Sequence, residues 1–517
     1  MLSKWVRNIL QATVYDVAIQ TPLDFAPKLS TRFNNDIRLK REDLQPVFSF
    51  KLRGAYNRIS QLSEQQKAQG VICASAGNHA QGVAFSAAKL GLKNIIVMPT
   101  TTPDIKVKAV KALGGNVDLY GDSFDDSNRY AIERSIKEGL TYIPPYDDEL
   151  VIAGQGTVAM EINQQWRDVE YVFVPVGGGG LLAGIAAFLG DVAPQVKVIA
   201  VEPEGAASLK AAIEANERVK LSQVSLFVDG TAVAQIGELP YEVFNLQKSD
   251  NSGKLIEQQV ITCSNDEVCA AVKDVFEENR SIVEPSGALA LAGMKKYLAE
   301  NQLTGKNCVA IISGANMNFD RLRYIAERTE IGEKKEAVFA VTIPERTGAF
   351  LEFCRDLKGR NITEFNYRAR SRTSPDSLEP ASIFVGIALK EGDKERHIIA
   401  NSLHEAGYDA HDLTDDDIAK SHIRYLIGGH AGMEDEQLFK VSFPERPGAL
   451  LNFLEKLGPD YNITLFHYRN HGAADGRVLV GIQATAKSSR AVQDTLQEIG
   501  YDCMPITDNI GYQLFLK

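Results

Sequence analysis

The chain has 517 residues, of which 44% are hydrophobic and 24% are charged, a globular composition that excludes disordered, collagen-like and coiled-coil classes. Its 56 basic and 67 acidic side chains leave a net charge of −11, which argues against a nucleic-acid partner and favours a protein that acts on small molecules. The length predicts about three or four domains.

Cysteine and histidine placement excludes several chemistries. Six cysteines lie far apart without a CxxC pair, so we expect reduced thiols and a cytoplasmic protein rather than disulfides or a zinc site. The N-terminal residues lack the apolar core of a secretory signal. Only His79 lies within the first 396 residues, so neither a metal site nor a Ser-His-Asp triad is expected there.

The first 320 or so residues predict an α/β fold with more than one lobe. Short apolar runs alternate with helical patterns, as in parallel sheets covered on both faces. The runs are at residues 94–99, 172–176, 198–201 and 308–312, and two of the helical patterns are at 125–137 and 268–278. Residues 171–190 carry no charge, but Pro175 and six glycines argue against a membrane helix, so no membrane partner is expected.

The first segment with chemical potential is 49–55 (SFKLRGA), which leads into a helical pattern. Lys51 lies between Phe50 and Leu52, where burial requires its charge to be neutralised, and a Schiff base is one way to do so. On this segment alone, a solvent-facing lysine is the more common arrangement.

The segment 75–82 (SAGNHAQG) follows an apolar run at 71–74. Small residues before a helix expose backbone N–H groups to an anion such as a carboxylate, and the Asn78 amide can donate to a ring oxygen. An ordinary strand-to-helix turn explains the same residues equally well.

Four consecutive glycines, 177–180, stand between an apolar run and a helical pattern. They allow several N–H groups to approach one phosphate. No Gly-Lys-Ser/Thr follows, and the contiguous glycines fit the dinucleotide fingerprint poorly, so neither a Walker loop nor an NAD enzyme is favoured. Ser313 follows the apolar run at 308–312, at the strand end where α/β sheets bind ligands, although one serine is weak support.

The C-terminal third contains an internal repeat. Pro-Glu-Arg-x-Gly-Ala recurs at 344–349 and 444–449, and Asn-Ile-Thr-x-Phe-x-Tyr-Arg at 361–368 and 462–469. Within each copy, an alternating strand pattern precedes a helix with one apolar face, which fits a β-α-β-β-α-β module. We therefore predict a catalytic domain at 1–320, a helical linker at 321–336, and modules at 337–420 and 421–517.

Together Lys51, the carboxylate-binding segment 75–82, the phosphate-binding glycines 177–180 and Ser313 resemble the active-site segments of the fold-type II pyridoxal-phosphate (PLP) enzymes. With its duplicated tail, the whole chain resembles the biosynthetic threonine dehydratases (threonine ammonia-lyases). The resemblance implies a two-lobed catalytic domain followed by two α+β ACT-like modules, with PLP as the cofactor.

The resemblance also implies roles for individual residues. Lys51 would hold PLP covalently and later remove the substrate α-proton, and Asn78 would contact the 3-hydroxyl oxygen of the ring. Gly177, Gly178, Gly179, Gly180 and Leu181 would hold the phosphate, and Ser313 would face the pyridine nitrogen. Ser75, Gly77 and His79 would help to hold the substrate carboxylate.

The implied reaction is dehydration and deamination of L-threonine to 2-oxobutanoate and ammonia, the first step of isoleucine biosynthesis. Serine racemase resembles the same loop but has a second serine where this chain has Ala76, which favours dehydration over racemisation here. Two alternatives stay open: a serine-preferring dehydratase, and a catalytically inactive amino-acid sensor. The intact Lys51 argues against the sensor.

The resemblance further implies a homotetramer inhibited by isoleucine, with valine acting oppositely, through the two modules. Tyr367 and Tyr468, in the matched Phe-x-Tyr-Arg segments, are the main candidates for effector contacts, followed by Arg424 and His467. These polar residues equally suit an interface between the modules.

Overall fold

The structure is a computed structural model that describes residues 3–246, 260–344, 353, 356–357, 360, 362–367, 381–425, 436–444, 463–469, 475–483, 489–498 and 502–515. The chain forms two compact units, Met1–Leu322 and Arg323–Lys517. Each is described by itself.

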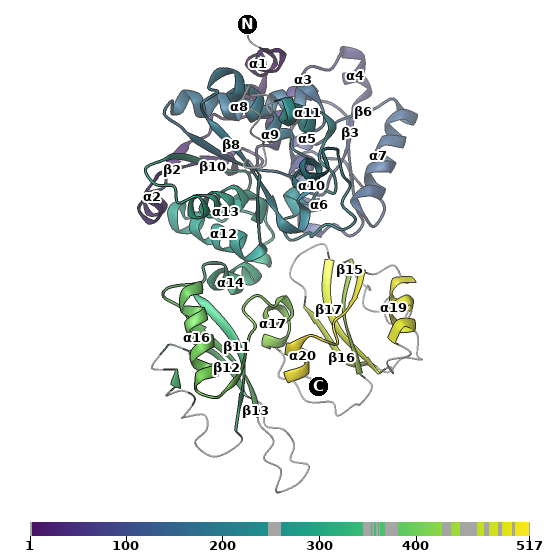
Figure 1. The fold of residues 1–517 in the computed structure, drawn as a ribbon. Helices are drawn as coiled ribbons and strands as arrows, with labels where there is room; N and C mark the ends of the chain where they lie inside the picture. The colour runs from purple at the N-terminus through teal and green to yellow at the C-terminus, as the bar shows by residue number, and fades with distance from the viewer. Residues whose placement is uncertain are drawn as a thin grey trace. The chain divides into compact units, whose positions relative to one another are not determined.

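A six-stranded sheet forms the large lobe of the first unit (Figure 1). Its strands, in spatial order, are β1 (Leu23–Phe25), β2 (Asp36–Arg41), β10 (Asn307–Ile312), β7 (Tyr171–Pro175), β8 (Lys197–Pro203) and β9 (Val260–Cys263). Only β1 pairs antiparallel; every other pairing is parallel. Three of the apolar runs are therefore neighbouring buried strands, as predicted.

Helices cover both faces of this sheet. On β7, Val172 and Val174 pack in one core with residues of α8 and α9, whereas the Phe173 ring lies 5.6 Å from the ring of Tyr297 in α13. The helices of this lobe are α1 (Lys4–Leu10), α2 (Pro27–Phe33), α8 (Glu149–Gln165), α9 (Gly180–Val192), α10 (Ser208–Ala215), α11 (Glu238–Leu246), α12 (Asn265–Asn279) and α13 (Pro285–Glu300). The patterns at 125–137 and 268–278 are helices α7 and α12, as predicted.

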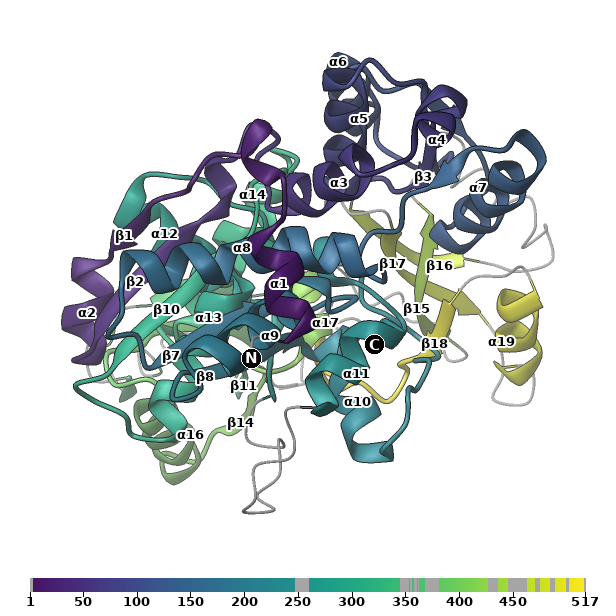
Figure 2. The ribbon, with the colours of Figure 1, turned by 90° about the horizontal axis from the view of Figure 1, so that it is seen from above.

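The small lobe is built on a parallel sheet whose strand order is β5 (Val117–Leu119), β4 (Asn94–Met98), β3 (Val71–Ala74) and β6 (Thr141–Tyr142). Figure 2 shows its helices gathered around β3, away from the strands of the large sheet. They are α4 (Glu64–Gln69), α5 (Asn78–Lys89), α6 (Asp104–Ala112) and α7 (Phe124–Glu138). Helix α3 (Lys51–Ser60) contacts both α5 and α8, so it lies where the lobes meet.

The uncharged segment 171–190 consists of β7, the glycine turn and most of α9, as its sequence predicts. Within the described residues, no helix has both the length and the apolar character needed to span a bilayer.

The second unit contains two similar antiparallel sheets. The first is β12 (Ile362–Tyr367), β13 (Ala381–Ala388), β11 (Glu336–Ile343) and β14 (Asp409–Asp412); the second is β16 (Ile463–Arg469), β17 (Asp475–Gln483), β15 (Glu436–Pro444) and β18 (Asp502–Pro505). Its helices are α14 (Arg321–Gly332), whose first two residues belong to the first unit, α16 (Asp393–Glu405), α17 (Asp417–Ser421), α19 (Ser489–Glu498) and α20 (Ile510–Phe515). The predicted helix of the second repeat at 450–457 lies outside the described residues.

Both faces of β11, an inner strand of the first module's sheet, are buried. On β11, Phe339 and Val341 pack in the core of the first module, while Val338 and Ala340 pack with Leu438 of β15. An alternating strand pattern, as predicted for each copy of the repeat, accounts for one buried face only. The second face is covered because the two modules share a core, which increases the apolar area removed from water.

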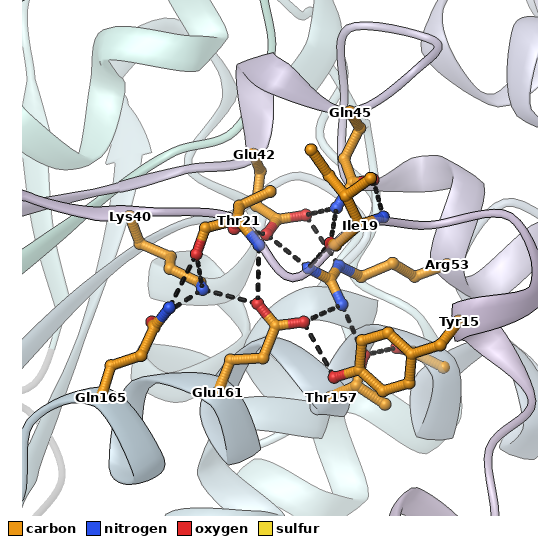
Figure 3. A network of polar contacts seen from close by, with 11 residues as sticks. Tyr15, Ile19, Thr21, Lys40, Glu42, Gln45, Arg53, Thr157, Glu161 and Gln165 are labelled. Atoms are coloured by element: carbon orange, nitrogen blue, oxygen red, sulfur yellow. Dashed lines mark hydrogen bonds and ion pairs between the residues drawn. The ribbon is translucent and has the colours of Figure 1, made fainter.

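A buried charge network fixes α3 inside the first unit (Figure 3). Lys40, Glu42, Arg53 and Glu161 have no exposed side-chain surface. The Arg53 guanidinium donates to Glu42 at 2.8 Å and to Glu161 at 2.6 Å, and Lys40 Nζ donates to Glu161 at 2.6 Å. Further contacts come from Tyr15, Ile19, Thr21, Gln45, Thr157 and Gln165. Two cations and two anions neutralise one another, which burial requires.

Candidate active site

A pocket in the first unit collects most of the predicted residues. Its lining includes Phe50, Lys51, Asn78, Tyr146, Pro175, Gly177–Gly180, Leu181, Gly230, Thr231, Glu284, Ser286 and Ser313. These come from α3, α5, the β7–α9 turn, the start of α13 and the end of β10, segments that are far apart in the sequence.

Lys51 is the first residue of α3 and its amine faces a neutral partner. Nζ donates to the carbonyl oxygen of Pro145 at 2.9 Å, and it lies 5.3 Å from the centre of the Phe50 ring. Burial lowers the pKa of Lys51 to about 8, although the negative charge of Glu284 acts in the opposite direction. A substantial fraction of the amine is therefore neutral near pH 8 and able to act as a nucleophile.

The four glycines form a cradle that side chains would fill. A Cβ on Gly178 would lie 2.1 Å from Cδ1 of Tyr146, and one on Gly177 would lie 2.9 Å from Cα of Thr231. Gly179 has φ +88°, which L side chains rarely adopt, and α9 begins at the next residue. A backbone-lined turn at a helix N-terminus suits an anion such as a phosphate.

Asn78, at the start of α5, lines the pocket and connects it to Glu284 and Asn316. Its Nδ2 donates to Oε1 of Glu284 at 2.6 Å, and its Oδ1 accepts from Asn316 Nδ2 at 2.7 Å. Burial, together with the negative charge of Asp229, raises the pKa of Glu284 to about 7. A carboxyl group that exchanges its proton near neutral pH therefore lies within the pocket.

Ser313 follows β10 and is buried. Its hydroxyl donates to the carbonyl oxygen of Ser286 at 3.0 Å, so it is held in the pocket lining by the start of α13. A hydroxyl can donate to or accept from a ring nitrogen without carrying a charge.

The predicted carboxylate loop lies next to the pocket, but its residues do not all face it. Ser75 Oγ accepts from Gly77 N at 3.2 Å, which orders the turn before α5. His79 is turned away: its Nε2 lies 2.9 Å from the carbonyl oxygen of Ile143, and burial, together with the charge of Lys51, lowers its pKa to about 3. A neutral imidazole bound to the backbone supports the loop, and the contact of His79 with the substrate carboxylate stays a prediction, because this bond involves only the ring and not the backbone N–H.

The regulatory candidates fall into two groups. Tyr367 lies on β12, and His467 and Tyr468 lie on β16, but the side chains of all three lie outside the described residues. Arg424 is described, and its NH2 group donates to both carboxylate oxygens of Glu336 at 3.0 Å. Arg424 therefore links the short turn Ile423–Tyr425 to the first residue of β11.

Pyridoxal phosphate fits the residues present. The cradle would hold the phosphate, the Lys51 amine is available for covalent attachment, and Asn78 and Ser313 offer hydrogen bonds to ring atoms. Both amide atoms of the buried Gln155 lack a hydrogen-bond partner in the described part of the chain, and its Oε1 lies 2.7 Å from the Cβ position of Gly180. An unpartnered amide directly beneath the cradle is consistent with a polar group bound there.

Sequence reasoning missed Glu284, Tyr146 and the Gly230–Thr231 wall of the pocket. A usable signal existed for Glu284, because the pattern Val-Glu-Pro-x-Gly-Ala occurs at both 201–206 and 283–288. Glu202, the counterpart of Glu284, is also buried with its pKa raised to about 7 by burial. Acidic side chains are rarely fully buried, so the repeated pattern, and not the residue type, was the signal. Tyr146 and the wall had no comparable signal.

Comparisons with known proteins agree with this geometry. A family model described as pyridoxal-phosphate dependent enzyme matches residues 14–314, and one described as the C-terminal regulatory domain of threonine dehydratase matches 327–423 and 427–516.

Similar proteins cover both units. The biosynthetic L-threonine dehydratase of Escherichia coli is 50% identical over 99% of this chain and 97% of its own length. The mitochondrial threonine dehydratase of Saccharomyces cerevisiae is 47% identical over 99% of this chain and 89% of its own. The solved structure of processed threonine deaminase isoform 2 from Solanum lycopersicum is 50% identical, with TM-score 0.60, over 63% of this chain and 92% of that chain. Maize serine racemase is 28% identical, with TM-score 0.57, over 62% of this chain and 95% of that one.

Proposed function

The chain belongs to the PLP-dependent biosynthetic threonine dehydratases, and we propose that it converts L-threonine to 2-oxobutanoate and ammonia at the pocket around Lys51. The observation that carries this proposal is the lysine amine, with a lowered pKa and a neutral partner, in the same pocket as a glycine cradle.

Residues of the chain divide the work between binding and proton transfer. Gly177–Gly180 and Leu181 hold the phosphate, Lys51 binds the cofactor aldehyde, and Asn78 and Ser313 orient the ring. The cofactor, when bound, supplies an electron sink for the electrons of the substrate C–H bond. With substrate bound, the neutral Lys51 amine would be the base that removes the α-proton, a role that its lowered pKa favours near pH 8.

Substrate is oriented by the turn before α5. The backbone N–H groups around Ser75 and Gly77 suit the substrate carboxylate, because they precede the N-terminus of a twelve-residue helix. Adding a Cβ to Gly77 would meet no atom within 4 Å, so the space beside this turn is open. Overall, loss of the β-hydroxyl as water and hydrolysis of the resulting enamine balance the conversion of threonine to oxoacid and ammonia.

The second unit binds small-molecule effectors, and in our proposal isoleucine inhibits and valine opposes it, with Tyr367 and Tyr468 as the main contacts. The equivalent strand positions of these tyrosines support the assignment: Tyr367 pairs with Ile383, and Tyr468 pairs with Val478. We retain Arg424 and His467 as weaker candidates, and modules divided near residue 420.

The proposal also covers the oligomeric state of the protein and its cellular compartment. The family resemblance supports a homotetramer, which light scattering of the purified protein tests. Five described cysteines are free thiols, which supports a reducing cytoplasm.

An oxoacid assay on purified protein tests the reaction. We expect 2-oxobutanoate from threonine, a lower kcat/KM with serine, and inhibition by isoleucine. Absence of oxoacid with PLP present would overturn the reaction, whereas a higher kcat/KM with serine would reassign the substrate. Activity indifferent to isoleucine would remove the regulatory assignment alone.

A further inference from the structure

Asp229 directly precedes the pocket wall formed by Gly230 and Thr231, and its carboxylate bridges two cations. Asp229 Oδ2 lies 2.9 Å from Lys106 Nζ, and its Oδ1 lies 3.2 Å from NH1 of Arg321. Burial favours the neutral acid, but the charges of Lys106 and Arg321 together lower the pKa of Asp229 well below its ordinary value. The carboxylate therefore stays ionised and bridging at neutral pH.

The two cations belong to different parts of the first unit. Lys106 lies on α6, one of the helices gathered around the small-lobe sheet (Figure 2). Arg321 lies at the start of α14, and its guanidinium also donates to the carbonyl oxygens of Phe227 at 2.9 Å and Leu226 at 3.3 Å. Because Arg321 is only 4% exposed and binds this segment at three points, Asp229 is held firmly on the large-lobe side.

The residues after Asp229 fit tightly into the pocket. A Cβ on Gly230 would lie 2.3 Å from Ser286 Oγ, and a Cβ on Gly177 would lie 2.9 Å from Cα of Thr231. The wall is thus wedged between the glycine cradle and the start of α13. A shift of Asp229 would be transmitted directly to the lining at both places.

We propose that Asp229 is a positioning residue that latches the small lobe, through Lys106, onto the cofactor-pocket wall held by Arg321. While the ion pair is intact, α6 is held to Asp229, next to the wall that lies against the glycine cradle. When it breaks, the lobes separate more readily and ligands leave faster. Apparent affinity falls in proportion to the closed fraction, whereas saturating substrate restores closure, so KM changes more than kcat.

The test uses holoenzyme variants K106Q, D229N and the double variant. Losing one charge-assisted contact that bridges the lobes is expected to raise KM for threonine and the rate of PLP release after dilution, each about tenfold. The double variant should match D229N, because D229N already removes the ion pair with Lys106 together with the contact to Arg321. K106R should recover most of the loss.

A matched control is K220Q. Lys220 and Asp125 also join this segment to the small lobe, at 3.5 Å, but their side chains are 64% and 73% exposed. Removing this pair should change both readouts less than about twofold.

The kinetic readout rests on the proposed function, but PLP release does not. If the wild-type protein forms no oxoacid, the proposed reaction is refuted. The rates of PLP release still test whether Asp229 holds the small lobe to the pocket wall. Multiplicative effects in the double variant, or equal effects from K220Q and K106Q, would overturn the latch. Should D229N fail to fold because Arg321 loses its partner, unchanged release and KM in K106Q would overturn it alone.

Discussion

Helix α3 carries residues of two contrasting polar regions. Arg53 belongs to the sealed network of Figure 3, in which each of the four buried charges has an oppositely charged partner within 2.8 Å. Lys51, two residues earlier, instead meets a carbonyl oxygen, and its pKa falls to about 8. The pocket also holds Glu284, whose pKa is raised to about 7 by burial.

The contrast shows how burial produces either rigidity or reactivity. A complete ion-pair network keeps its charges fixed and has no capacity for a ligand. In the pocket, Lys51 and Glu284 are buried without a complete set of oppositely charged partners. Their protonation therefore changes near neutral pH, as proton transfer requires. Placing Arg53 and Lys51 both on α3 lets the sealed network hold the helix while Lys51 reacts.

The largest expected effect comes from removing the reactive amine. Lys51→Ala should lower kcat for threonine by about 10³–10⁴-fold, because the neutral base and the covalent anchor are both lost. Oxoacid formation and borohydride trapping followed by peptide mapping measure it. Lys108→Ala, at an exposed position on α6, is the control; normal turnover in Lys51→Ala would refute the assignment.

Breaking the buried charge network should lower the stability of the fold and not act directly on the catalytic step. Glu161→Ala leaves Lys40 and Arg53 without their shared carboxylate and is expected to lower the free energy of unfolding by about 3–5 kcal/mol. Urea unfolding measures this loss. Glu149→Ala on the same helix removes an exposed pair with Lys4, 63% and 44% exposed, and should cost under about 1 kcal/mol.

Filling the cradle should weaken cofactor binding. Gly178→Ala forces a Cβ to within 2.1 Å of the Tyr146 ring, so ring or turn must move, at a cost of about 1–3 kcal/mol. Part of this cost should appear as weaker PLP affinity in a titration of the apo-protein. Unchanged affinity would mean that the phosphate binds elsewhere.

The smallest effect is a shift in pH dependence. PLP capture by the apo-protein needs the neutral Lys51 amine, so its rate should rise with pH and level off above about pH 8. Glu284 raises the pKa of Lys51, so Glu284→Gln should move this midpoint to lower pH. Stopped-flow absorbance across pH measures the midpoint; a shift to higher pH would contradict the electrostatics.

Local patterns predicted much of the molecule. The four apolar runs are strands β4, β7, β8 and β10, and Lys51, Gly177–Gly180 and Ser313 lie at the helix and strand ends where turn chemistry and periodicity placed them. The partner of the His79 ring was not predicted: it is the carbonyl oxygen of Ile143, 64 residues away in the sequence. Sequence spacing does not reveal such long-range hydrogen bonds.

By itself the sequence determined the α/β class, the duplicated tail and the amine, glycine and serine components, because each depends on near neighbours in the chain. Only the tertiary structure decided that Glu284 faces Asn78, that Tyr146 lies against the cradle, and that Asp229 joins Lys106 to Arg321. Protonation and closeness of approach depend on what packs around a group after folding, and those neighbours come from distant parts of the chain.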